Sequence, residues 1–190
     1  MHAEGEMPAP TLTWDAGWPK TAEEFRTLVD AYSDRLVGYA FRRVGNLQDA
    51  EDVVQDVFVR TYRLPPGRRG GLQVGPYLYR SVANACTDLL RKRTRSAAAR
   101  EKIGGQEPVR SGEEPSELAL AAEELRRAES LLARLPEAQA EVIRLRVFDE
   151  LRLGEIAEVV GCSVNTVCSR LRYGFRKLRR LVPQERREAR

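Results

Sequence analysis

The feature that most constrains the fold is the segment 153–171, LGEIAEVVGCSVNTVCSRL. Its first half predicts a short helix with an apolar stripe, because Ile156 and Val160 lie one turn apart. Gly161 suits the left-handed residue that ends a helix, and Ser163 is a good N-cap for the next helix. The apolar residues of that next helix are Val164, Val167 and Leu171. This spacing predicts a helix-turn-helix, a motif whose second helix enters the major groove of duplex DNA.

The outward face of the second helix carries side chains that can contact base edges and phosphates. They are Ser163, Asn165, Thr166, Ser169, Arg170 and Arg172. These six residues are therefore the candidate contacts to a duplex DNA element.

The composition favours an all-helical chain. Charged residues make up 32% of it and aromatic residues only 7%, while Ala, Leu, Arg and Glu dominate the periodic stretches. The net charge is only +4, but it is unevenly distributed: segments 91–100 and 170–190 are basic, and segment 48–56 is acidic. Local basic patches on a nearly balanced chain indicate a nucleic-acid partner.

Several classes of function lack the residues they need. The single histidine, His2, lies in the N-terminal tail, so a Ser-His-Asp arrangement is excluded, and the three cysteines form no CxxC pair for zinc. The glycines of segment 64–76 lack the Lys-Ser/Thr ending of a phosphate-binding loop. The acidic cluster around Asp52 and Asp56 is interpreted as a partner-binding face rather than a metal site. We therefore expect no catalytic activity, no metal and no cofactor.

The chain also lacks an apolar run long enough to cross a bilayer, and its N-terminus lacks the order of a signal peptide. The sequence thus predicts a soluble, cytoplasmic protein with no membrane insertion. Cys86 and Cys162 are expected in the core as small buried hydrophobes. Cys168, beside two arginines, is either an inert cysteine or a redox-sensitive one, and we favour the inert interpretation.

Hydrophobic periodicity predicts two helical units. Three helices are expected at 21–44, 49–62 and 77–93, with a Pro- and Gly-rich loop at 64–76, and further helices at 117–135, at 136–148 and in the helix-turn-helix. The predicted organisation is a flexible extension at 1–20, a first domain at 21–95, a linker at 96–116, a second domain at 117–183 and a basic tail at 184–190. In the extension, Trp14 and Trp18 are expected to dock on the neighbouring domain rather than to bind a partner.

The predicted third helix ends in a dense run of cations, Arg91, Lys92, Arg93 and Arg95. One or two cations would satisfy the dipole at the end of a helix. The excess predicts a second place where the chain contacts phosphates.

Several stretches resemble a known family. Segments 25–63 and 76–95 resemble region 2 of a bacterial sigma factor of the extracytoplasmic-function (ECF) group, within the sigma-70 family, and 132–181 resembles region 4. The run DAEDVVQDVF is the specific signal, because a helix-turn-helix occurs in many regulators. The resemblance implies an all-α, two-domain protein that binds core RNA polymerase and directs promoter-specific transcription initiation.

The resemblance also implies roles for residues and partners. Region 2 would bind the clamp coiled coil of the largest polymerase subunit, and region 4 the flap of the second subunit. The clamp would contact Asp49, Glu51, Asp52, Gln55 and Asp56. The −35 promoter element would contact the six residues of the helix-turn-helix. The −10 element would contact Tyr77, Tyr79, Arg80, Asn84, Asp88, Arg91 and Arg93. Many members are held inactive by an anti-sigma factor, so such a partner is expected here.

Departures from the family pattern concern promoter preference. Cys168 stands where Lys or Arg is usual, and Tyr77 stands where tryptophan is usual. One alternative is a conventional regulator that binds a palindromic operator as a dimer without polymerase; it leaves DAEDVVQDVF and the run 91–95 unexplained. Another is an interaction protein that sequesters polymerase, in which the DNA contacts of Arg170 and Arg172 would be dispensable.

Overall fold

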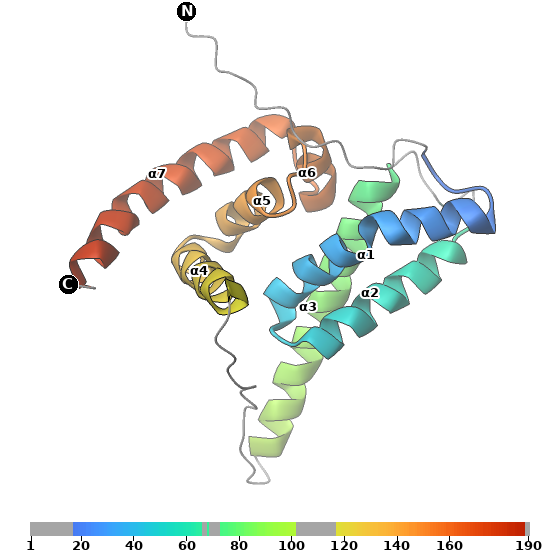
Figure 1. Cartoon of the computed structure of the whole chain (residues 1–190), viewed down its shortest axis with the longest axis horizontal. Helices are drawn as coiled ribbons and strands as arrows, with labels where there is room; N and C mark the ends of the chain where they lie inside the picture. Colours follow the sequence, from blue (N-terminus) through green and yellow to red (C-terminus); the bar gives the residue numbers. More distant parts are fainter. Residues whose placement is uncertain (1–16, 66–67, 69–72, 102–116, 189–190) are drawn as a thin grey trace, which may run out of the picture.

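The computed structural model describes residues 17–65, 68, 73–101 and 117–188, and seven α-helices but no strand occur among them (Figure 1). The predicted all-helical fold is therefore confirmed. Trp14, residues 66–67 and 69–72 of the predicted loop, and the greater part of the predicted linker lie outside the described residues. None of the described helices is long and apolar enough to span a bilayer.

The N-terminal unit contains three helices that pack on one another, α1 (Ala22–Val44), α2 (Leu47–Tyr62) and α3 (Val74–Glu101). Each of the first two begins at a side-chain cap. The Thr21 hydroxyl oxygen accepts a hydrogen bond from the Glu24 backbone N–H, and the Asn46 side-chain oxygen accepts one from the Asp49 N–H. These caps satisfy N–H groups that a helix start leaves free, and they place each start within two residues of the predicted one.

Helix α3 is longer than the sequence pattern predicted. It begins at Val74 instead of Tyr77 and continues to Glu101 instead of Arg93, so the first residues assigned to the linker are helical. Proline is compatible with the first turn of a helix, which explains why Pro76 does not delay the start. The segment Ser96–Glu101 contains three consecutive alanines followed by Arg100 and Glu101, and all three residue types have high helix propensity.

The C-terminal unit contains α4 (Glu117–Leu132), α5 (Glu137–Val147), α6 (Leu153–Val160) and α7 (Val164–Glu188). Helices α6 and α7 form the predicted helix-turn-helix. Gly161 ends α6 with φ 68°, and Ser163 Oγ accepts a hydrogen bond of 3.2 Å from the Thr166 backbone N–H. Further along, α7 crosses α5 at the buried Gly174, where a Cβ atom would lie 2.6 Å from Ile143 Cδ1. The close crossing thus depends on a residue without a side chain.

The two helical units pack against each other, with α3 alongside α6 (Figure 1). A single buried cluster includes Tyr39 and Val82 of the first unit together with Val142, Leu145 and Ile156 of the second. The sequence predicted two domains joined by a linker but did not predict this interface. Cys86 is buried in the same cluster as predicted, and burial raises the pKa of its thiol to about 11.

Candidate nucleic-acid interface

The predicted DNA-facing side chains of α7 lie on its N-terminal turns. Ser163, Asn165 and Arg172 are exposed, while Thr166, Ser169 and Arg170 are half-buried. Arg170 Nη1 lies 3.7 Å from the Cys162 sulfur, which holds this guanidinium over the turn between α6 and α7. Cys168 is exposed on the same helix, whereas Cys162 is half-buried against the core.

A second polar surface runs along α3 and is here called the α3 stripe. Its residues recur every three or four positions and so share one face of the helix. They are Tyr77, Arg80, Asn84, Asp88, Arg91 and Arg95. All are exposed except Tyr77, which is half-buried at the N-terminal end of the stripe. The only ion pair recorded within the stripe is a loose one of 3.8 Å between Asp88 and Arg91, so its cations remain accessible.

A shallow open pocket lies over the C-terminal half of the stripe. Its lining combines hydroxyls, cations and one carboxylate with the apolar surface of Leu90. Bases need both polar partners and apolar contact when they leave the helical stack, and this surface offers both.

Two predicted −10 contacts lie apart from the α3 stripe. Tyr79 is fully buried, and its hydroxyl donates to Asp149 Oδ1 over 3.5 Å, so in this conformation it cannot touch DNA. Burial raises the pKa of Tyr79 far above its usual value. Arg93 turns to the other side of α3, where it pairs with Asp49 and donates to the Val44 carbonyl oxygen. The family resemblance, and not the helical spacing, placed these two residues with the others.

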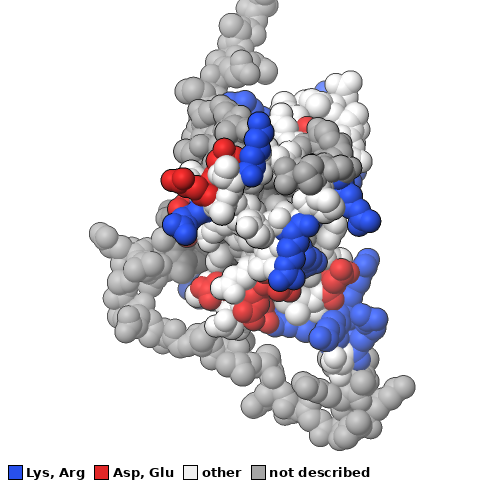
Figure 2. Space-filling view, turned by 90° about the vertical axis from the view of Figure 1, so that its right-hand side faces the viewer, with Lys and Arg blue, Asp and Glu red and all other residues white. Residues whose placement is uncertain are grey.

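The acidic side chains predicted to bind polymerase lie on α2. Asp52, Gln55 and Asp56 are exposed, and Glu51 is half-buried. Glu51 and Gln55 line a groove of about 620 Å³ between α1 and α2, together with Asp34. The remaining lining is mostly apolar: Val29, Val37, Phe41, Leu47, Val54 and Phe58. Figure 2 looks onto the side formed by α1–α3 and shows acidic side chains next to a cluster of basic ones.

Comparison with known proteins identifies the family. The Sigma-70 region 2 model matches residues 28–96, and the Sigma-70 region 4 model matches residues 131–180. The ECF RNA polymerase sigma-E factor of Escherichia coli is 31% identical over 155 residues, which cover 77% of this chain and 80% of that protein. The chain is an ECF sigma factor of the sigma-70 family. The ECF RNA polymerase sigma factor SigW of Bacillus subtilis is 28% identical over 165 residues, covering 83% of this sigma factor and 88% of SigW.

Solved structures show the same fold. CnrH in complex with the cytosolic domain of CnrY matches with a TM-score of 0.64 and 25% identity, over 87% of this sigma factor and 91% of that chain. RpoE of Bartonella quintana in complex with the anti-sigma factor NepR matches with a TM-score of 0.63 and 20% identity, over 85% and 98% of the two chains.

Membership of this family confirms the function expected from the resemblance. The sigma factor acts in transcription initiation and is not an enzyme. The N-terminal unit is region 2 and the C-terminal unit contains region 4, so the alternative of a conventional operator-binding regulator is wrong.

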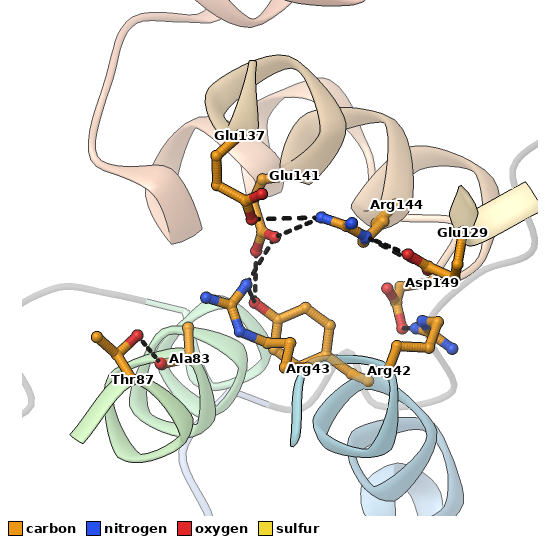
Figure 3. Close-up of polar contacts among 10 residues, drawn as sticks. Arg42, Arg43, Ala83, Thr87, Glu129, Glu137, Glu141, Arg144 and Asp149 are labelled. Carbon is orange, nitrogen blue, oxygen red and sulfur yellow. Dashed lines mark hydrogen bonds and ion pairs between the residues drawn. The ribbon is translucent and has the colours of Figure 1, made fainter. Parts of the chain in front are cut away.

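Regions 2 and 4 of the sigma factor meet in a set of ion pairs, here called the interdomain cluster (Figure 3). Arg42 of α1 pairs with Asp149 at 2.7 Å, and Arg43 pairs with Glu141 of α5 at 2.6 Å. The Tyr39 hydroxyl donates to Glu141 Oε1 over 2.6 Å. The side chains of Arg42 and Asp149 are only 11% and 2% exposed, so solvent and salt screen this pair weakly.

Asp149 is the most perturbed carboxylate among the described residues. Its burial raises the pKa to about 6, against the opposing effect of Arg42. The cause is visible in its contacts: Oδ1 accepts from Arg42 and Tyr79, but Oδ2 has no hydrogen-bond partner among the described residues. A buried carboxylate oxygen without a partner disfavours the charged form.

Sequence reasoning missed the residues of the interdomain cluster. Glu141 and Asp149 lie about a hundred positions from their arginine partners, and no local pattern encodes such a contact. One consequence is that the two DNA-facing surfaces are neighbours. A Cβ atom on Gly161 of the helix-turn-helix would lie 3.0 Å from Nη2 of Arg80 in the α3 stripe.

Proposed function

We propose that the sigma factor contacts the −10 element through the α3 stripe and the −35 element through the exposed N-terminal turns of α7. The observation that carries this proposal is the alignment of exposed and half-buried side chains that suit bases and phosphates on these two helices, within regions 2 and 4 respectively. Promoter-directed initiation needs one surface for duplex DNA and one for an opened strand, and the two helices meet these needs differently.

The α7 surface suits duplex DNA. Ser163, Asn165, Thr166, Ser169, Arg170 and Arg172 are the proposed −35 contacts. A helix whose first turns are exposed can enter the major groove, where arginine and asparagine pair with base edges. Cys168 lies among them and cannot make the charged contact that Lys or Arg would make, so one phosphate or base contact is absent.

The α3 stripe suits a single strand. Arg80, Arg91 and Arg95 supply charge for a backbone, Tyr77 supplies an aromatic face, and Asn84 and Asp88 supply polar partners for a base. Arg93 and Tyr79 have other partners in this structure, and we leave them out of the proposed contact surface.

For the polymerase, the proposed contact is the exposed face of α2 with the groove beside it. Asp52, Gln55, Asp56 and Glu51 present negative charge and amide groups next to apolar surface, which fits the clamp coiled coil of the largest subunit. Asp49 is paired with Arg93, so it supports this surface from its edge. Region 4 would contact the flap of the second subunit. We infer that the protein acts in the cytoplasm, together with polymerase.

Promoter binding further requires the two regions to separate. The −35 and −10 elements lie about 25 positions apart, which is roughly 85 Å of B-form DNA at 3.4 Å per base pair. In the structure, α3 and α6 are in contact, so one promoter cannot reach both surfaces at once. The closed arrangement is thus a state that an anti-sigma factor could hold, and RpoE of Bartonella quintana, of the same fold, was solved with the anti-sigma factor NepR bound.

The proposal is tested by transcription in vitro. Purified bacterial core polymerase is incubated with a pool of genomic fragments, with and without this protein. Start sites that appear only when the protein is added, and that share two upstream elements, are the expected result. The substitutions Arg170→Ala and Arg91→Ala should then weaken use of the −35 and −10 elements respectively. If Arg170→Ala left promoter use unchanged, α7 would take no part in the mechanism. The alternative in which the protein only sequesters polymerase requires this result.

A further inference from the structure

The segment before α1 brings an aromatic side chain to the end of the α3 stripe. The indole ring of Trp18 lies edge-on to the phenol ring of Tyr77, with 5.0 Å between ring centroids and 62° between ring planes. Trp18 packs against the main core, and the adjacent Pro19 is buried. The position of Trp18 is therefore fixed by the fold, although it belongs to an extension that precedes region 2.

Tyr77 begins the line of side chains that continues through Arg80 and Asn84 along α3. Both rings of the aromatic pair are half-buried, so each keeps part of its surface open to solvent. The α3 stripe thus has charged and polar side chains along its length and two adjoining aromatic rings at its N-terminal end.

We propose that Trp18 is a further promoter-contacting residue. Together with Tyr77, it forms an aromatic platform on which an unstacked base of the opened strand packs when the strand's backbone follows the cations of α3. The inference rests on the proposed role of the α3 stripe and extends it to a residue outside the matched region 2, which begins at residue 28.

The chemistry of stacking defines what Trp18 contributes. Every base has a π face, so stacking on an aromatic ring increases affinity with little dependence on base identity. Indole offers a larger face than phenol, and this tryptophan stands next to the tyrosine that replaces the usual tryptophan of the family. Trp18 should therefore strengthen single-strand binding and set its starting position, while Asn84 and Asp88 discriminate between bases.

Direct contact can be observed by fluorescence. The chain contains two tryptophans, so the variant Trp14→Phe leaves Trp18 as the only indole in the full-length protein. Titration with a mixed-sequence single-stranded 20-mer should quench this fluorescence to saturation at low salt. The same sequences as duplex should quench much less. Absence of quenching while the strand binds, measured by anisotropy of a labelled strand, would overturn the proposal.

The functional contribution is measured in the complex with core polymerase. Trp18→Ala should reduce open-complex formation, on a promoter found by the transcription assay, by roughly 5- to 150-fold, the range expected for one stacked base, and Trp18→Phe should recover part of the loss. Permanganate reactivity of unpaired thymines provides the readout. Polymerase binding and thermal unfolding of the variants are measured in parallel, because Trp18 also packs on the core.

A matched control is available elsewhere in region 2. Tyr62 and Phe25 form an aromatic pair with the same centroid distance, 5.0 Å, and an interplanar angle of 67°. In the Trp14→Phe background, Tyr62→Ala removes an aromatic pair outside the α3 stripe and should leave quenching of Trp18 by the single strand unchanged in the absence of polymerase. If Trp18→Ala behaves as the wild type, the platform is wrong; if it forms more open complexes, Trp18 covers Tyr77 instead of assisting it. If the wild type itself forms no open complexes, the proposed function fails. The fluorescence titration still tests whether Trp18 contacts single-stranded DNA.

Discussion

Asp149 illustrates how one buried side chain responds to its surroundings. Arg42 and Tyr79 face its Oδ1, and Glu141 acts on it from α5. Its folded-state pKa of about 6 lies above the ordinary aspartate value of 3.8, so the folded chain takes up a proton at a higher pH than the unfolded chain does. The contribution of this proton to the free energy of unfolding has its full value below about pH 4 and is lost as the pH rises through about 6.

We therefore expect acidification from pH 7 to pH 5 to stabilise the wild type relative to Asp149→Asn. The relative gain in free energy of unfolding should be about 1 kcal/mol, the value given by this change in proton uptake. Urea unfolding at the two pH values measures it. Glu150→Gln, at the exposed neighbour, should keep the wild-type pH dependence. A parallel response of the wild type and Asp149→Asn would show that Asp149 does not titrate in this range.

Two glycines of the helix-turn-helix offer a paired test of backbone conformation. Gly161 has φ 68°, a left-handed conformation that costs an alanine about 1 kcal/mol, and its added Cβ would press on Arg80. Gly154 lies within α6 in open space. Gly161→Ala should lower the free energy of unfolding by about 1 kcal/mol or more, whereas Gly154→Ala should raise it by up to about 1 kcal/mol. Equal effects of the two substitutions on thermal unfolding would contradict the different backbone requirements at Gly161 and Gly154.

At the scale of the elements, local chemistry predicted most of the structure. The turn at Gly161 and the cap at Ser163 depend on neighbouring residues, so their sequence signal is direct. The predicted end of α3 was wrong because apolar periodicity was its only signal, and the segment Ser96–Glu101 is helical without large apolar residues. Side-chain direction was the harder problem: Tyr79 and Arg93 lie near the expected contacts in sequence but point elsewhere.

The α3 stripe predicts a distinct electrostatic behaviour. Arg91→Ala removes one accessible cation and should weaken binding of single-stranded DNA. The slope of log K against log salt should become about 0.7 less negative, the value for one lost phosphate contact to a single strand. Arg26→Ala, which removes an exposed arginine from α1, should leave both quantities unchanged. Anisotropy titrations at several salt concentrations measure them, and an unaltered slope for Arg91→Ala would exclude it from the contact surface.

At the scale of the whole molecule, the interface between regions 2 and 4 determines which surfaces are available. Sequence could not predict it, since Arg43 and Glu141 are separated by 98 positions and each also suits an exposed helix surface. Only the three-dimensional arrangement reveals that the arginines of α1 face carboxylates of region 4.

Reversing one charge should open the molecule. Glu141→Arg would place a third cation beside Arg43 and Arg144. Breaking this part-buried ion pair costs up to about 3 kcal/mol, which lowers the ratio of closed to open chains by up to about 100-fold. The radius of gyration from small-angle scattering should increase, and the exchange Arg43→Glu with Glu141→Arg should restore it. An unchanged radius for the single variant would show that the interdomain cluster does not hold the closed state.

The long sequence separation within the interdomain cluster also matters while the protein is being made. Ribosomes add roughly 5–20 residues per second, and domains generally fold as they emerge. Glu141 follows Arg43 by 98 positions, so region 2 is exposed for roughly 5–20 s before its intramolecular partner is synthesised. During this interval, the nascent chain exposes Arg42, Arg43 and the surface around Tyr79. Each newly made sigma factor therefore passes through an open form once, before region 4 exists to close it.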